Sequence, residues 1–162
     1  MRATGHTQLL KYWDNTDVVR NVLRWYEKYR NQPAELVADL HDCTTDEKCY
    51  AIFDYLVNHV RYLEDKPGYQ FIKSPARLLA DGVGDCKSMT LFLASCLHCL
   101  GVPHTIRFVN FDGGTQYTHV YVLAHDGSRI ITLDAVERDP KGQPVYNYAR
   151  EFARCLDTYY KN

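Results

Sequence analysis

Residues 81–100 read DGVGDCKSMTLFLASCLHCL, and this stretch decides the fold. Gly82 and Gly84 indicate a turn, and an apolar run of helical character begins at Cys86. The N-terminus of a helix carries free N–H groups and the positive end of the helix dipole, which favour a thiolate over a thiol. Cys86 is therefore the one cysteine of six that the sequence places to react, and Lys87 adds a positive charge nearby.

The composition is that of an ordinary globular protein. The chain has 162 residues, of which 46% are hydrophobic and 24% charged, so we expect one domain over residues 1–162. The net charge of -1 gives no electrostatic case for binding nucleic acid or an anionic membrane. No run approaches the roughly 18 apolar residues that span a bilayer, and residues 1–15 lack the apolar segment of a secretory signal, so we expect none. A cytoplasmic location is therefore expected.

The remaining cysteines give no pattern of a metal site. Cys96 and Cys99 form a CxxC inside an apolar helix, and adding Cys43 and Cys49 does not give the spacing of a zinc knuckle. Without an export signal we interpret all six cysteines as reduced thiols. The sequence predicts core packing for these four side chains, with no metal and no cofactor.

The first half of the chain carries helical patterns. We expect a loosely attached arm at residues 1–15 and a helix over residues 16–30. Thr44 and Glu47 form a capping-box pattern that opens a helix to about residue 61. Residues 62–73 are expected to form a loop, because Pro and Gly lie at their centre. The sequence thus predicts N-terminal helices ahead of the central one.

The second half changes to the period-two pattern of strands. Strands are expected at residues 105–111, 117–124 and 129–136, and a last helix at residues 147–160. This order predicts an α+β fold, in which the central cysteine-bearing helix packs on a small antiparallel sheet.

Asp126-Gly127 is a strong two-residue hairpin signal. If these residues form the turn, counting back along both strands places His119 directly opposite Asp134. Facing side chains have Cβ atoms about 4.5–5.5 Å apart. A carboxylate there fixes the tautomer and orientation of the imidazole, whose other nitrogen is free to take a proton from a thiol. The sequence therefore predicts a nucleophile at Cys86, a general base at His119 and an orienting acid at Asp134.

Acyl transfer also requires donors for the oxyanion of the tetrahedral intermediate. The backbone N–H of Cys86 is one candidate. For the second we favour Gln70, whose side-chain amide lies in the loop upstream, and Tyr69 is the alternative.

Three motifs together resemble the transglutaminase-like superfamily, a branch of the papain-like fold with the chain order Cys, His, Asp. They are GVGDC at 82–86, THVYV at 118–122 and LDAV at 133–136. The resemblance covers about residues 55–136, the expected catalytic core, and points to small bacterial and phage cysteine proteases of this kind. It implies the same three catalytic roles. Animal transglutaminases carry Trp after the nucleophile, where this chain has Lys87.

The resemblance implies a thiol hydrolase or acyltransferase that acts on peptide or amide bonds of a peptide or protein substrate. A peptidase or deamidase is favoured over a cross-linking transglutaminase because the chain is small, although one triad serves both reactions. The alternative is a phage structural or assembly module with an inactive triad, whose partners belong to the virion or its assembly. The aromatic Tyr12 and Trp13 would then form contact surface.

Overall fold

The computed structural model of the chain describes residues 5–10 and 14–161, so the expected contacts of Tyr12 and Trp13 lie outside the described residues. Its helices are α1 (Asn15–Tyr29), α2 (Thr45–His59), α3 (Pro75–Asp81), α4 (Cys86–Cys99) and the short 3-10 helix η1 (Ala38–Leu40). Its strands are β1 (Thr7–Leu10), β2 (Arg61–Tyr62), β3 (Gln70–Lys73), β4 (Val83–Gly84), β5 (His104–Asn110), β6 (His119–Asp126), β7 (Arg129–Leu133) and β8 (Arg154–Tyr160). Within these ranges, no helix is long and apolar enough to cross a membrane.

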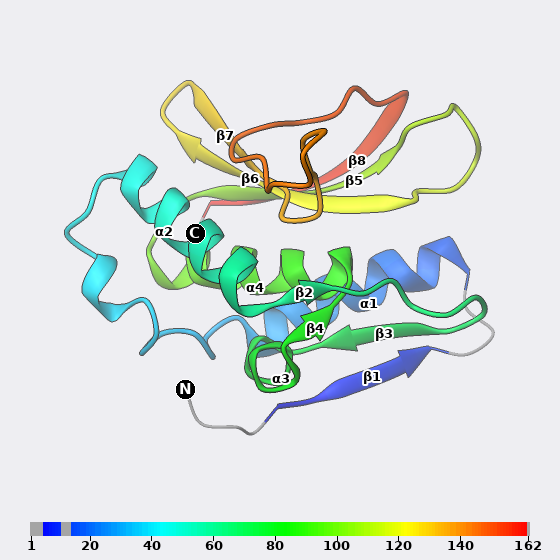
Figure 1. The fold of residues 1–162 in the computed structure, drawn as a ribbon, viewed down its shortest axis with the longest axis horizontal. Coiled ribbons are helices and arrows are strands. Elements are labelled where there is room, and N and C mark those ends of the chain that lie inside the picture. Colours follow the sequence, from blue (N-terminus) through cyan, green and yellow to red (C-terminus); the bar gives the residue numbers. More distant parts are fainter. Residues whose placement is uncertain (1–4, 11–13, 162) are drawn as a thin grey trace.

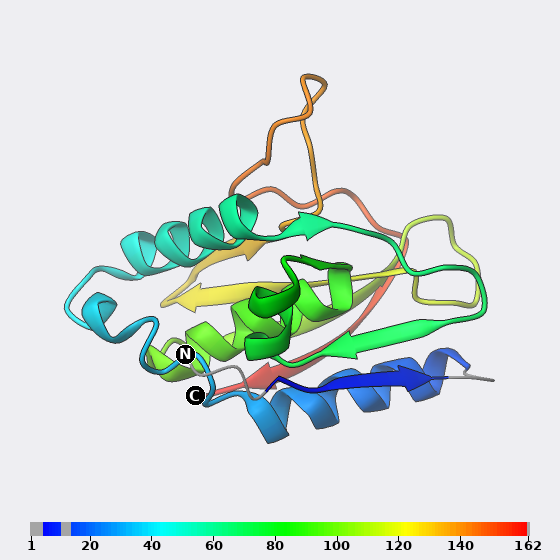
Figure 2. The same cartoon turned by 60° about the horizontal axis from the view of Figure 1, so that its bottom comes forward.

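Helix α4 lies at the centre of the molecule, between two antiparallel sheets (Figure 1). The four-stranded sheet, in the order β7-β6-β5-β8, covers one side, and the β1–β3 pair covers the other. Helices α1 and α2 flank α4 and contact it (Figure 2). All residues of α4 from Lys87 to Leu97 are buried, so this helix is the core element on which the other layers pack.

Short-range signals in the sequence set both ends of α4. The side chain of Asp85 accepts hydrogen bonds from the backbone N–H groups of Lys87 and Ser88, which caps the N-terminus. Gly101 follows the C-terminus with φ +71°, the left-handed conformation that glycine adopts without strain. The predicted central helix is confirmed, and so is the helix that begins after the capping box of Thr44 and Glu47.

Helix α3 ends at Gly82, just before the cysteine. Gly82 has φ +68°, and its N–H donates to the carbonyl of Leu78. A Cβ at this position would meet only the carbonyl oxygen of His59, at an ordinary 3.7 Å, so alanine would fit sterically. The requirement for glycine is therefore one of backbone conformation alone.

Gly82→Ala is expected to lower the free energy of unfolding by about 1 kcal/mol, the cost of holding alanine in the left-handed region. Urea unfolding followed by tryptophan fluorescence measures this loss. An unchanged unfolding midpoint would show that the chain relaxes at this turn without strain.

The expected last helix at residues 147–160 is wrong. Arg154–Tyr160 instead forms β8, antiparallel to β5. The ring of Tyr160 packs against those of Tyr26 and His104, at centroid distances of 4.7 and 5.4 Å. Aromatic and β-branched residues favour a strand wherever a partner edge exists, and β5 lies more than forty positions away in the sequence. Local patterns could not reveal that partner.

The expected loose arm at residues 1–15 is also wrong in its described middle part. Thr7–Leu10 forms β1 and pairs with β3, antiparallel, from Thr7 opposite Lys73 to Leu10 opposite Gln70. The loop predicted at residues 62–73 is correspondingly shorter, because Gln70–Lys73 is a strand. Both differences arise from one pairing between segments that are distant in sequence.

Candidate active site

Cys86 is the first residue of α4, and its side chain is half-buried. The chain reaches it through Gly84, where a Cβ would lie 2.4 Å from Cδ1 of the buried Leu78. Glycine is needed there because the backbone passes so close to the core. The turn and the cap at Asp85 together hold Cys86 at the helix N-terminus, as the sequence predicted.

His119 and Asp134 lie in contact beside this helix end. His119 begins β6, Asp134 follows the last residue of β7, and Nε2 of His119 lies 2.6 Å from Oδ2 of Asp134. The other carboxylate oxygen accepts a hydrogen bond from the backbone N–H of Val136 at 3.1 Å. Asp134 is almost fully buried and His119 is 10% exposed, so the hydrogen bond between them is shielded from water.

The predicted register of this hairpin is wrong, although the predicted contact between His119 and Asp134 is present. Asp126 pairs with Arg129, so the two turn residues are Gly127 and Ser128 rather than Asp126 and Gly127. Gly127 has φ +61°, as a type II′ turn requires of its first central residue. His119 and Asp134 are therefore diagonal neighbours. A slip of two residues keeps side chains on the same face of the sheet, so the contact survives.

The surroundings of His119 favour its protonated form. Burial opposes the charged imidazolium, but hydrogen bonds to Asp134 and Cys86, together with the charges of these groups, raise the pKa of His119 to about 10. The imidazole therefore lies between the thiol and the carboxylate, and a proton that it accepts from the thiol is held strongly.

A cavity of about 350 Å³ opens beside these residues. Cys86, His119 and Gln70 all line it, whereas Tyr69 does not and is 43% exposed. Gln70 is the first residue of β3, and its side-chain amide has no hydrogen-bond partner among residues 5–10 and 14–161. Of the two candidates for the second oxyanion donor, Gln70 lines this cavity and Tyr69 does not.

Asn15 also lines the cavity, and the sequence analysis did not identify it. The side-chain amide of Asn15 donates to the carbonyl of Tyr117 at 2.9 Å and accepts from the N–H of Tyr117 at 2.6 Å. The start of α1 thereby braces the segment that leads into His119. Asn15 and Tyr117 are 102 positions apart in the sequence, so no local sequence pattern indicates their contact.

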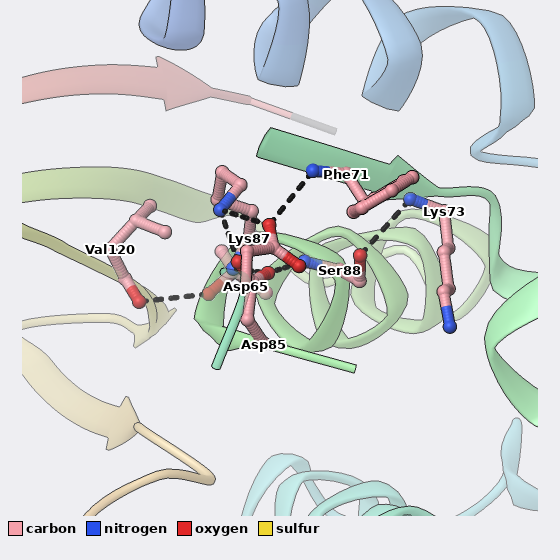
Figure 3. Close-up of polar contacts among 8 residues, drawn as sticks. Asp65, Phe71, Lys73, Asp85, Lys87, Ser88 and Val120 are labelled. Carbon is pink, nitrogen blue, oxygen red and sulfur yellow. Dashed lines mark hydrogen bonds and ion pairs between the residues drawn. The ribbon is translucent and has the colours of Figure 1, made fainter. Parts of the chain in front are cut away.

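The charge of Lys87 is not free, in contrast to the expectation that it would add a positive charge near the thiol. The Lys87 ammonium forms ion pairs with Asp85 and with Asp65, the latter at 3.3 Å (Figure 3). Burial raises the pKa of Asp85 to about 6 against the opposing effect of Lys87, and Asp65 adds to the rise. Burial lowers the pKa of Lys87, but the surrounding negative charges outweigh it and raise that pKa.

Glu137 brings a further carboxylate to the histidine pair. One ligand atom each from His119, Asp134 and Glu137 lie within 4.8 Å of one another, which is close enough to hold a cation. In this arrangement Nε2 of His119 already makes a hydrogen bond to Asp134, and a cation on that nitrogen would displace it. The geometry thus fits a hydrogen-bonded pair better than a metal centre.

The other cysteines near the core lack the surroundings of a nucleophile. Cys49 and Cys96 are fully buried, as expected for core packing. Burial raises the pKa of Cys49 to about 12 and that of Cys96 well above its ordinary value. Cys99 is half-buried, and its thiol contacts the carbonyl of Arg30 at 3.3 Å.

The model of the transglutaminase-like superfamily matches residues 30–135, more than half of the chain. The chain belongs to this superfamily. The matched region of this transglutaminase-like chain includes Cys86, His119 and Asp134. The family predicted from the sequence motifs is therefore confirmed. No curated protein matches the chain.

Solved structures share the fold of this transglutaminase-like chain. A candidate cysteine protease from Cytophaga hutchinsonii superposes with a TM-score of 0.52 and 15% identity, over 94% of this chain and 60% of that one. A candidate protease from Parabacteroides distasonis gives a TM-score of 0.57 and 14% identity, over 76% of this chain and 27% of that one. Calcium-bound LapG from Legionella pneumophila gives 0.54 and 21%, over 83% of this chain and 87% of that one.

These identities show a common fold. The transglutaminase-like chain spans about 60% and 27% of the lengths of the first two relatives. The predicted α+β, papain-like fold, with the cysteine-bearing helix against an antiparallel sheet, is confirmed.

Proposed function

We propose that this protein is a thiol hydrolase that cleaves peptide or amide bonds, with Cys86 as nucleophile, His119 as general base and Asp134 as orienting acid. The observation that carries the proposal is the 2.6 Å hydrogen bond between His119 and Asp134, beside a cavity that His119 shares with Cys86. The fold shared with candidate proteases supports it. Burial of the pair adds support, because a shielded carboxylate holds an imidazole strongly.

The geometry leads to a two-step reaction. His119 takes the proton of Cys86, and the sulfur attacks the carbonyl carbon while the carbonyl electrons move onto oxygen. The N–H of Cys86 and the amide of Gln70 donate to this oxyanion. The C–N bond then breaks, the leaving amine takes the proton from His119, and a thioester remains. Water attacks the thioester and gives its proton to His119. The carboxylic acid leaves, and the proton returns to the thiol.

Hydrolysis is favoured over transfer to an amine for a physical reason. Water needs no binding site of its own, whereas a second amine must be held next to the thioester. The half-buried position of Cys86 and the volume of about 350 Å³ beside it suit one acyl group and a small nucleophile. The substrate, the cytoplasmic location and the phage partners stay predictions.

Cys86 is expected to react with iodoacetamide about tenfold faster than Cys155 at pH 7. Cys155 is half-buried too, but burial and the charge of Asp157 raise the pKa of its thiol. Cys86 instead lines the same cavity as His119 and interacts with its imidazole. Peptide mass spectrometry of samples quenched over time gives both rates in one protein.

The control for this experiment is His119→Ala, in which Cys86 is expected to lose its advantage over Cys155. Equal rates for the two thiols in the unchanged protein would contradict the proposed function. They would instead favour the assembly module with an inactive triad.

A further inference from the structure

One edge of β3 is bound by side chains rather than by another strand. β1 pairs with one edge, and on the other edge the N–H of Phe71 donates to Oδ2 of Asp65 at 2.8 Å (Figure 3). Two residues later the N–H of Lys73 donates to Oγ of Ser88 at 3.0 Å. Because Ser88 belongs to α4, the second bond ties β3 directly to the helix that carries Cys86.

Asp65, which accepts the hydrogen bond from Phe71, is itself bonded to α4. Its Oδ2 also accepts from the Lys87 ammonium, which in turn pairs with Asp85, the cap of α4. The side chains of Lys87 and Asp65 are 8% and 15% exposed, so water competes little for these contacts. One carboxylate thus links the backbone of β3, the first turn of α4 and the loop before β3.

The hydrogen bond between Asp65 and Phe71 closes a loop of seven residues, which we call the 65–71 loop. Residues 66–69 are exposed, and the N–H of Tyr69 donates to the carbonyl of Lys66 at 3.1 Å within the loop. The bond from Phe71 to Asp65 is the one that joins the two ends of the loop. Gln70 is the last residue inside the closure, and it lines the cavity beside Cys86. Gln70 pairs with Leu10 of β1 on one edge of β3, and the bond of Asp65 to the next residue holds the opposite edge.

We propose that Asp65 is a positioning residue, which Lys87 anchors and which closes the 65–71 loop so that the Gln70 amide faces the oxyanion formed at Cys86. This inference rests on the proposed function and deepens it. Asp65 lines the cavity, but its carboxylate is bonded to the N–H of Phe71 and to Lys87 rather than to Cys86 or His119. Its effect on the reaction passes through the backbone of Phe71 to Gln70.

A positioning role and a purely electrostatic role of Asp65 predict opposite effects of its removal on the reactivity of Cys86. Without this carboxylate, Lys87 is left with Asp85 as its one ion-pair partner among the described residues, and more positive charge faces the thiol. A charge effect alone would make Cys86 more reactive towards every electrophile. A positioning effect slows only reactions that pass through a tetrahedral oxyanion, because only these use Gln70.

Two probes separate these effects. p-Nitrophenyl acetate acylates the thiol: sulfur bonds to the carbonyl carbon, an oxyanion forms, and p-nitrophenolate leaves with the ester oxygen. Iodoacetamide alkylates the same sulfur by direct displacement of iodide, with no oxyanion. For Asp65→Ala we expect acylation of Cys86 to fall by at least about tenfold. Alkylation of Cys86 should stay within about threefold of the unchanged protein or rise.

Three further variants make the experiment specific. Asp65→Asn keeps an oxygen for the N–H of Phe71, and it is expected to recover most of the acylation rate. Gln70→Ala is expected to lose acylation as Asp65→Ala does, and the double variant no more than Gln70→Ala alone, because both act through one amide. Asp81→Ala, which removes a carboxylate paired with Lys73 outside this cavity, is the matched control and should acylate normally.

The outcomes distinguish this inference from the proposed function. Unchanged acylation in Asp65→Ala, or losses that multiply in the double variant, would overturn the positioning role while the hydrolase proposal stands. A parallel fall of acylation and alkylation would also overturn it, since it would place the effect of Asp65 on the thiol itself. If the unchanged protein is not acylated at all, the proposed function fails, and the role of Asp65 fails with it.

Discussion

Replacing His119 with alanine is expected to slow acylation of Cys86 by p-nitrophenyl acetate about 10³-fold. The imidazole lies between the thiol and the buried Asp134, and it is the proton acceptor that the geometry offers. Its loss removes the base and leaves the Asp134 carboxylate buried without its cationic partner. The burst of p-nitrophenolate in a stopped-flow experiment at pH 7 measures the rate.

His125→Ala provides a matched control on the same strand. His125 also lies on β6, but its ring bonds to Thr105 at 2.8 Å, and it does not line the cavity with Cys86. Acylation in this variant should match that of the unchanged protein. A His119→Ala variant that folds and keeps its acylation rate within about threefold would remove His119 from the mechanism.

Lys87→Met is expected to lower the free energy of unfolding by about 3 kcal/mol at pH 8. Lys87 is the shared cation of two carboxylates, and its side chain is 8% exposed. Methionine fills a similar volume but leaves Asp85 charged in the protein interior. Breaking one side of a buried ion pair costs more than the pair contributes, because the remaining charge has no solvent to replace its partner.

The loss should be smaller at pH 5 than at pH 8. The pKa of Asp85 is about 6 in the folded protein against an ordinary 3.8, so the folded state takes up a proton before the unfolded chain does. Such a group stabilises the fold at low pH, and this contribution is lost as the pH rises through about 6. In Lys87→Met, Asp85 is buried as a neutral carboxyl at pH 5, which costs little stability. At pH 8 it is buried as an unpaired carboxylate, which costs much more.

Urea unfolding at both pH values measures these losses. Lys73→Met is the control, because Lys73 pairs with Asp81 in a more exposed position. This variant should lose about 1 kcal/mol or less. Equal losses for the two lysine variants, or a Lys87→Met loss that does not change with pH, would contradict the account given for the buried carboxylates.

The central helix was predictable because its signals are local. Asp85, the glycines before it and Gly101 after it act on neighbouring backbone, and the apolar run between them has few alternatives. Strands β1 and β8, which pair with remote segments, were not predictable in this way. β1 and β8 owe their structure to β3 and β5, and no pattern within residues 7–10 or 154–160 identifies those partners.

The contact between His119 and Asp134 illustrates how a prediction can bring two residues together through an incorrect register. The sequence favoured a turn centred on Asp126 and Gly127, whereas the turn in the structure is centred on Gly127 and Ser128. The resulting shift is even, so His119 and Asp134 stay on one face and still meet. The role of Asp65, by contrast, could not be predicted from the sequence. It lies twenty-one positions before Cys86, and only the folded chain brings its carboxylate to Lys87.

The burial of α4 also determines which positions of this protein tolerate amino-acid substitution. Every residue from Lys87 to Leu97 lies inside the core, so almost any substitution along the helix that carries Cys86 disturbs packing. Residues 66–69 are exposed, and apart from Gly68, whose φ of +84° favours glycine, they can be replaced with little effect on stability. Variation in substrate preference is therefore expected to arise in this short exposed segment, which directly precedes the cavity-lining Gln70, because new side chains there leave the position of the thiol unchanged.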